Sequence, residues 1–331
     1  MNEIRCYIKS IRNYKGVISI IRHFGNFISR KFIKYVYNNY PKELRYLLKS
    51  NIINLTPKPI VDKCEYDYNI TIKLATQDLI INDISKFDLT KLDDSEDFEA
   101  IHRFSWIRYF LSEKDYDYKS IEHIKLSIEH WCKYYVVDRK IKKSLIWSSY
   151  TNSERIVNII MFYKCINEKP KQHVKYSLDI MSSHLIKNLE CFNNLYGNHI
   201  INNFRALTIY ASYYSNNNLL KLSYSYLCDF VNNFIYNGFT KDYSSHYHLL
   251  LYFWLKDILM FLKTDNASLS TEKVKQHAES LYKNLSLFII NGDFLFLGDI
   301  SPDYPAAYLL TLDNDYLYQK KYSIQNLYSR L

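Results

Sequence analysis

Glycine and proline are scarce in this sequence, which contains only 6 of each among its 331 residues. Folds built from sheets and tight turns usually need more of both, so the composition favours helices. Long apolar runs are lacking too, because no stretch approaches the roughly 18 apolar residues typical of a membrane-spanning helix. Near the N-terminus, charges interrupt every apolar run before it reaches the length of a signal-peptide core, which predicts a cytoplasmic location.

Cysteines are also few, and they are scattered without a Cys-x-x-Cys pair or a Cys–His cluster at zinc-ligand spacing. This distribution argues against a disulfide scaffold and favours reduced thiols inside a cell. No cluster of carboxylates at ligand spacing accompanies the histidines, so we expect no metal site. The cysteines are Cys6, Cys64, Cys132, Cys165, Cys191 and Cys228.

The net charge of +9 is concentrated at the N-terminus. Residues 1–50 contain 11 Lys or Arg and 2 acidic residues, so 11 − 2 gives +9 and the rest of the chain is balanced. Ile4, Ile8 and Ile11 recur at helical spacing, which predicts a basic amphipathic helical arm. The arm can pack on the protein body or contact the inner membrane peripherally, and both interpretations stay open. Nucleic acid is disfavoured as a partner, because no nucleic-acid-binding motif accompanies the charge.

Tyrosine is unusually frequent, with 33 copies. One interpretation is compositional drift, since Asn, Ile and Lys are frequent as well. The other is a groove lined with rings that hold a sugar or a base.

The apolar pattern has a helical period from about residue 96 onward. Ile200, Phe204, Leu207 and Ala211, for example, advance by four, three and four residues and make one apolar stripe. Short connections between helices of this length indicate antiparallel helical hairpins. We expect helices at 96–112, 117–138, 151–167, 171–190, 198–215, 217–236, 244–264 and 271–290.

Three regions follow from these patterns. Residues 1–50 form the predicted basic arm, and residues 96–331 form a helical domain. Residues 51–95 lack a helical period and include two prolines, so we expect an extended linker with room for a short strand or two. The predicted fold class is therefore all-α.

Polar and aromatic residues interrupt the apolar helices in four clusters: FEAIHRFSWIRYF (98–110), IWSSYTNSERIVN (146–158), NHIINNFR (198–205) and YSSHYH (243–248). Each cluster has a structural interpretation. Asn198 can be a helix cap, Glu154 and Arg155 can form an ion pair in a first helical turn, and the tryptophans can be packing anchors.

The clusters also have a chemical interpretation, because Asn, His and Tyr at helix N-termini can converge at one end of a helical barrel. An Asn amide that hydrogen-bonds a sugar carboxylate lowers the pKa of the adjacent C–H. A Tyr or His can then take that proton, and a Tyr can return one to the leaving oxygen. This chemistry is β-elimination of a uronate-containing polysaccharide, and it needs no cofactor.

The motifs HRFSWI, WSSYTNSERIVN, GNHIINNFRAL, NGFTKDYSSHYHLLL and GDISPDYP, in this order, resemble the helical domain of heparinase II/III-like polysaccharide lyases. The similarity covers residues 85–310 approximately and is strongest to members associated with bacterial surface-polysaccharide gene clusters. It implies that the helical domain is an incomplete (α/α) toroid of antiparallel hairpins. It also implies β-elimination on an acidic, glycosaminoglycan-like surface polysaccharide.

The resemblance implies roles for individual residues. Asn198 corresponds to the amide that neutralises the carboxylate, His199 to the adjacent imidazole, and Tyr247 to the tyrosine that acts as base, acid or both. The residues that the resemblance places in or beside the substrate groove are Trp106, Trp147, Arg155, Asn202, His246 and His248.

Two departures from the family pattern support an alternative function. Asn237–Gly238 stands where the family has Asp–Gly, and Asp242 stands where a Glu is common. In the family, a β-sandwich domain after the toroid closes the cleft. This sequence has no block of β-hairpins after the helical region, which favours the alternative, and supply of the domain by a separate chain stays open. The alternative is a catalytically inactive glycan-binding or scaffold protein in surface-polysaccharide biosynthesis.

Overall fold

The computed structural model describes residues 70–74, 78–81, 94–112, 118–137, 145–190, 197–265, 269–290, 293–301, 303–304 and 309. The predicted basic arm, residues 1–50, lies outside these ranges, as does most of the predicted linker. The described residues are mostly helical, which confirms the all-α prediction.

A short β-hairpin lies within the predicted linker. Strand β1 (Ile70–Lys73) pairs antiparallel with β2 (Asp78–Ile81). The side chain of Ile72 is only 1% exposed and belongs to the same apolar core as the helices. This part of the linker therefore packs on the helical domain.

The α-helices in the described part of the chain are α4 (Ser95–Arg103), α5 (Trp106–Ser112), α6 (Tyr118–Trp131), α7 (Ser149–Cys165), α8 (Gln172–Lys187), α9 (Asn198–Tyr213), α10 (Asn217–Phe234), α11 (Ser245–Asp265) and α12 (Glu272–Leu285). A π-helical segment, Cys132–Val137, continues α6, and a 3-10 turn, Ser286–Phe288, follows α12. Two small antiparallel hairpins complete the set: β3 (Ile235–Tyr236) with β4 (Phe239–Thr240), and β5 (Ile289–Ile290) with β6 (Asp293–Phe294).

The helix boundaries correct the sequence predictions at three places. The helix expected at 96–112 is broken at Phe104, whose φ of 58° lies in the left-handed region. Helix α7 begins earlier than expected, because Ser148 is its cap and accepts a hydrogen bond from the backbone N–H of Thr151. The cap of α9 is Gly197, so Asn198 is the first helical residue and not a cap.

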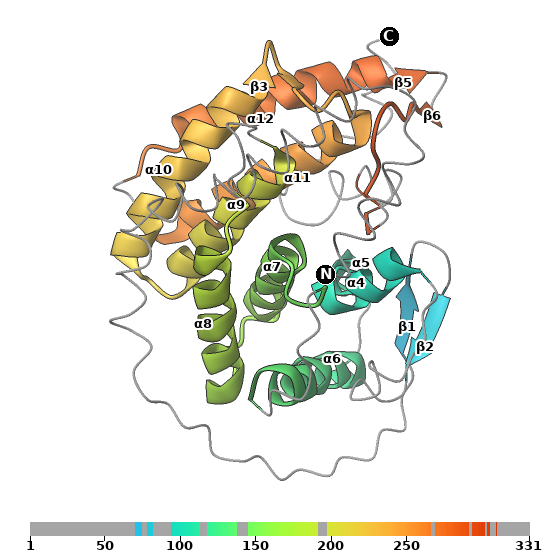
Figure 1. Cartoon of the computed structure of the whole chain (residues 1–331), viewed down its shortest axis with the longest axis vertical. Coiled ribbons are helices and arrows are strands. Elements are labelled where there is room, and N and C mark those ends of the chain that lie inside the picture. Colours follow the sequence, from blue (N-terminus) through green and yellow to red (C-terminus); the bar gives the residue numbers. More distant parts are fainter. Residues whose placement is uncertain are drawn as a thin grey trace, which may run out of the picture.

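The helices form two layers that curve in an arc (Figure 1). Helix α9 packs against both α7 and α11, and α8, α10 and α12 each pack against the helix before them in the chain. Helix α7 is buried on every side from Ser149 to Tyr163, whereas α10 and α12 bury only one face. The hairpin pairing agrees with the sequence prediction, and a toroid remains a prediction.

No helix in the described ranges combines the length and the apolarity needed to cross a membrane.

Candidate functional site

The first turns of α7, α9 and α11 meet around Tyr150. Tyr150 is the second residue of α7 and His199 is the second residue of α9, and their ring centres are 4.8 Å apart. Burial raises the pKa of Tyr150 well above its ordinary value, and Glu154 and Tyr247 contribute to the same shift. His199 and Tyr247 therefore both act on Tyr150, His199 through the ring contact and Tyr247 through its effect on the Tyr150 pKa. We call Tyr150, His199, Tyr247 and Arg103 the Tyr150 centre.

The start of α9 offers hydrogen-bond donors to an anion. The cap residue Gly197 has no side chain that could accept a hydrogen bond from the first turn, and Asn198 is only half-buried. The backbone N–H groups of a helix start carry partial positive charge. His199 is exposed, and its Nδ1 lies 3.2 Å from Oε1 of Glu190. This contact orients the imidazole and leaves its Nε2 for another partner.

Tyr247 is half-buried in the first turn of α11. Its backbone N–H donates to Oγ of Ser244 at 3.0 Å, and the N–H of Ser244 donates to Oδ1 of Asp242 at 3.2 Å. Burial raises the pKa of Tyr247 to about 12, although the positive charge of Arg103 opposes the shift. Tyr247 therefore carries its proton at neutral pH and can act as a hydrogen-bond donor or an acid.

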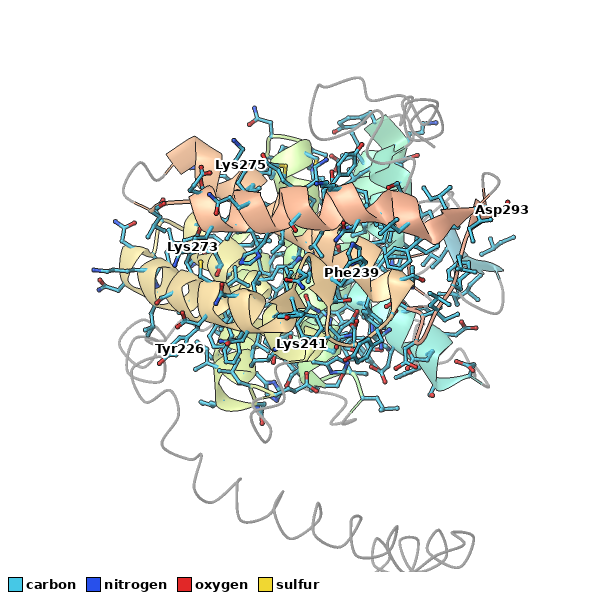
Figure 2. All side chains as sticks on the ribbon, turned by 90° about the horizontal axis from the view of Figure 1, so that it is seen from above. Tyr226, Phe239, Lys241, Lys273, Lys275 and Asp293 are labelled. Carbon is cyan, nitrogen blue, oxygen red and sulfur yellow. The ribbon has the colours of Figure 1, made fainter. Side chains whose placement is uncertain are left out.

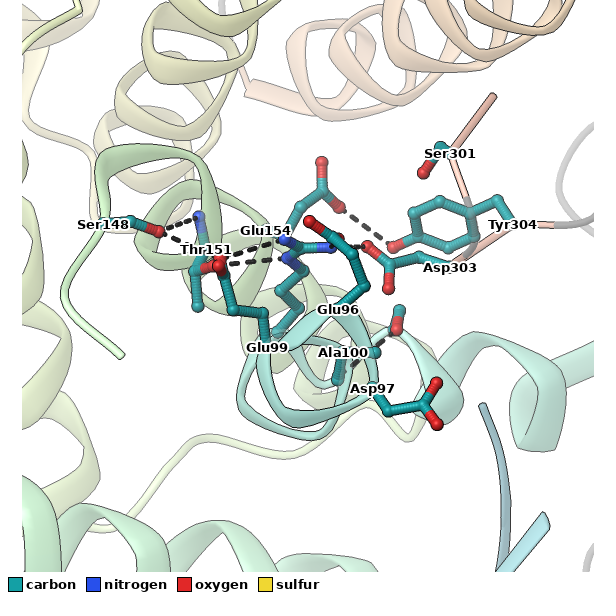
Figure 3. A network of polar contacts seen from close by, with 12 residues as sticks. Glu96, Asp97, Glu99, Ala100, Ser148, Thr151, Glu154, Ser301, Asp303 and Tyr304 are labelled. Atoms are coloured by element: carbon teal, nitrogen blue, oxygen red, sulfur yellow. Dashed lines mark hydrogen bonds and ion pairs between the residues drawn. The ribbon is translucent and has the colours of Figure 1, made fainter. Parts of the chain in front are cut away.

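Arg103, at the end of α4, is a residue of the Tyr150 centre that the sequence analysis did not single out. Its guanidinium carbon lies 5.1 Å from the centre of the Tyr150 ring. Three carboxylates surround it: Asp303 at 2.6 Å, Glu99 at 3.0 Å and Glu96 at 3.1 Å (Figure 3). The signal in the sequence was weak, since Asp303 is 200 residues away.

Burial affects the pKa of Asp303 more than its ion pair with Arg103 does. The carboxyl group is fully buried, and its pKa rises to about 6 even though Arg103 opposes the shift. Around neutral pH, Asp303 and Glu99 both face the single charge of Arg103. The immediate surroundings of Arg103 are therefore acidic rather than basic.

A second layer of buried charges lies under the Tyr150 centre. Arg205 donates to Glu154 at 2.8 Å and to Asp257 at 2.7 Å. Arg108 also donates to Asp257, at 2.7 Å, and its Nε donates to Oδ1 of Asn158 at 2.8 Å. Burial alone raises the pKa of Asp257, but the two guanidinium groups outweigh it, so the pKa is lowered.

Ser301, Asp303 and Tyr304 are each hydrogen-bonded to side chains of the helices. The Tyr304 hydroxyl donates to Oε2 of Glu154 at 2.9 Å, on the central helix α7 (Figure 3). His246 binds these residues at two points: its Nδ1 accepts from the N–H of Ser301 at 2.8 Å, and its Nε2 donates to the carbonyl of Tyr304 at 2.6 Å. Both ring nitrogens of His246 are therefore occupied, and the predicted substrate contact is corrected to a structural role.

Other predicted groove residues also lie in the core. Arg155 is fully buried, donates to the carbonyls of His102 and Ile146, and lies 4.1 Å from the centre of the Trp131 ring. Burial lowers its pKa to about 9. The ion pair expected between Arg155 and Glu154 is not formed, because Glu154 pairs with Arg205. Since a buried side chain cannot reach a polymer, Arg155 is corrected to a structural residue.

Trp106 and Asn202 are buried as well, with exposed fractions of 4% and 0%. Asn202 lies beneath the Tyr150 centre, where its Oδ1 accepts from Arg205 at 2.7 Å. Trp147 is half-buried, and its ring centre is 5.1 Å from that of His184 on α8. Of the predicted substrate-binding residues, Trp147 keeps partial exposure, while Trp106 and Asn202 are corrected to core positions.

A pocket of about 970 Å³ adjoins the Tyr150 centre. Its walls come from the end of α10, the β3–β4 hairpin, the start of α11 and the 3-10 turn after α12. Gly197, which precedes Asn198, and Ser244, which caps the turn of Tyr247, both line it. Of the residues predicted from sequence to contact substrate, the buried His248 lines this pocket.

Within the described ranges, no three His, Cys, Asp or Glu side chains are grouped so that they could hold a metal ion. Comparison with protein-family models, with curated proteins and with solved structures finds no match to this chain.

Proposed function

We propose that the Tyr150 centre binds an acidic, uronate-containing polysaccharide and cleaves it by β-elimination, in the manner of heparinase II/III-like lyases. The observation that carries the proposal is that the packed helices α9 and α11 both present a first-turn residue to Tyr150: the His199 ring contacts the Tyr150 ring, and Tyr247 is close enough to raise the Tyr150 pKa. The resemblance extends the proposal to a bacterial surface glycan as substrate and to a β-sandwich domain that closes the cleft.

The geometry supports a division of roles. Asn198 and the first-turn N–H groups of α9 hold the uronate carboxylate, which lowers the pKa of the neighbouring C–H. Nε2 of His199 takes that proton, and the electron pair of the C–H bond forms the new C=C bond. The glycosidic C–O bond breaks, and Tyr247 donates its proton to the leaving oxygen. With a pKa of about 12, Tyr247 holds its proton at neutral pH, so the proton is present for transfer to the leaving oxygen.

A second candidate function is glycan binding without elimination. It is favoured by the surroundings of Arg103, the cation that acts on Tyr247. Asp303 and Glu99 already neutralise this guanidinium, so it is not free to bind a uronate or to stabilise the charge that develops during elimination.

The deciding measurement is the ultraviolet absorbance of unsaturated uronates while the purified protein is incubated with a panel of acidic polysaccharides. We expect a rising signal with the wild-type protein and a loss of at least about 100-fold in Tyr247→Phe, because general acid catalysis contributes about 10²–10⁴-fold. Tyr118→Phe is a matched control, since Tyr118 is 74% exposed on α6.

The outcomes separate the two candidates. A flat trace together with glycan binding in calorimetry would establish the binding function and remove the lyase. A signal that Tyr247→Phe leaves unchanged would overturn the assignment of Tyr247 as the acid.

A further inference from the structure

The pocket beside the Tyr150 centre has aromatic walls. The ring centre of His248 lies 5.1 Å from Phe288 and 5.9 Å from Phe239, and the two phenylalanine rings are 6.2 Å apart. Tyr236 and Tyr243, also lining residues, are 68% and 86% exposed. Figure 2 views the molecule from above and labels Phe239 near the α10–α12 pair. The pocket therefore offers ring faces both inside and at its rim.

Tyr243 is an unusual residue to find exposed. Its φ of 56° lies in the left-handed region, which is strained for a bulky residue. With 86% of its surface in solvent, the ring offsets little of this strain by burial. Strained, exposed residues of this kind concentrate at binding sites.

Two polar atoms on residues that line the pocket are buried hydrogen-bond acceptors without a partner. Nε2 of His248 donates to the carbonyl of Leu281 at 2.9 Å, so in the neutral ring Nδ1 is an acceptor, and it is buried without a partner. Oδ2 of Asp242 is likewise buried without a partner. A ligand that satisfies both atoms must bring hydrogen-bond donors.

The charge of the pocket is balanced, since Lys241 and Asp242 are the charged residues that line it. Its volume lies near the upper end of the range of about 300–1,000 Å³ that small-molecule sites occupy. A neutral ligand with apolar ring faces and several hydroxyl donors fits all of these properties.

We propose that this pocket binds a neutral sugar unit, whose C–H face packs on the aromatic walls and whose hydroxyl groups donate to His248 and Asp242. The inference rests on the proposed function, because the neutral unit belongs to the polymer held at the Tyr150 centre. Gly197 and Ser244 connect the two places: one precedes Asn198 in the chain, and the other accepts from the Tyr247 N–H.

The test is binding to an array of neutral and uronate-containing oligosaccharides. The wild-type protein is compared with the double variant Tyr236→Ala/Tyr243→Ala and with Tyr118→Ala, a control that removes an equally exposed tyrosine from α6. We expect the double variant to lose about tenfold in affinity, because one well-placed aromatic contact contributes about 0.5–1.5 kcal/mol. Tyr118→Ala should bind like wild type.

Each outcome decides one of the two proposals. If the wild-type protein binds only neutral oligosaccharides and the double variant binds them more weakly, the result supports the pocket assignment and contradicts the proposal of an acidic substrate. If uronate oligosaccharides bind and the double variant matches wild type, the pocket assignment is overturned while the proposed function survives. Binding to no oligosaccharide would overturn both.

Discussion

The interior of the helical arc differs from the segments that follow α10 and α12 in the groups that it buries and exposes. In the interior, α7 carries the buried charges Glu154 and Arg155, and α9 and α11 add Arg205 and Asp257. In the segments after α10 and α12, between positions 236 and 300, lie nine of the twelve large apolar side chains that are exposed among the described residues. Charged side chains are buried between α7, α9 and α11, and aromatic side chains such as Tyr236 and Tyr243 are exposed in the lining of the pocket.

The contrast separates residues that hold the structure from residues available to a ligand. A buried ion pair gains little over an apolar pair, but removing one partner leaves an uncompensated charge in the core. An exposed ring can be removed at little cost to folding. The two regions should therefore respond differently to substitution.

The largest effect is expected from Asp257→Asn, which removes the shared partner of Arg108 and Arg205. The free energy of unfolding should fall by about 3–5 kcal/mol, because two buried guanidinium groups lose their common carboxylate. Urea denaturation followed by circular dichroism measures it. Glu279→Gln is the control, since the Lys275–Glu279 pair is exposed and is worth under about 1 kcal/mol. If the two substitutions lowered the free energy of unfolding equally, the difference between buried and exposed charges would be contradicted.

A smaller effect is expected from the pH dependence of Asp303. Its folded-state pKa of about 6 lies above the ordinary value of about 3.9, so between these values the folded protein holds a proton that the unfolded chain has released. The contribution of this carboxyl group to stability therefore falls as the pH rises from about 4 to about 6.

Urea titrations of wild type and Asp303→Asn across this pH range measure that contribution. The difference in unfolding free energy, wild type minus variant, should be larger at pH 4 than at pH 7. A difference that grows with pH would mean that the ion pair with Arg103 outweighs burial.

The smallest effect on stability is expected from Tyr243→Ala in the pocket rim. Because the side chain is 86% exposed, the free energy of unfolding should change by no more than about 0.5 kcal/mol. Thermal denaturation measures this change alongside the oligosaccharide array. A large loss of stability would mean that Tyr243 is a structural residue, and it would contradict the difference proposed between the buried interior and the exposed pocket residues.

Much of the fold could be predicted from local patterns. The apolar stripe of Ile200, Phe204 and Leu207 predicts α9, and all three side chains are buried. The YSSHYH cluster lies at the start of the helix expected at 244–264, and Oγ of Ser244 accepts from the Tyr247 N–H as a cap does. Helix period and capping are local properties of the chain, so they are visible without tertiary structure.

The candidate site was predictable only in part. His199 and Tyr247 lie at helix starts, and a rule about helix starts can find them. Tyr150 also lies at a helix start, but Arg103 lies at a helix end and has no local mark, because its role depends on contacts with residues far along the chain. The predictions for Arg155 and His246 were wrong because both side chains are buried. In the sequence, a polar residue of a helix has the same pattern whether its side chain faces solvent or carbonyl groups of the core.

The sequence by itself determined that the described part of the chain is mostly helical and that polar clusters mark several helix starts. Only the tertiary structure decided which of these polar groups are enclosed. A guanidinium or imidazole becomes structural when the packing of other helices removes it from water and supplies its hydrogen bonds. The same packing leaves His199 exposed and Tyr247 half-buried beside an aromatic pocket. That selection depends on residues up to 200 positions apart, and no local pattern records it.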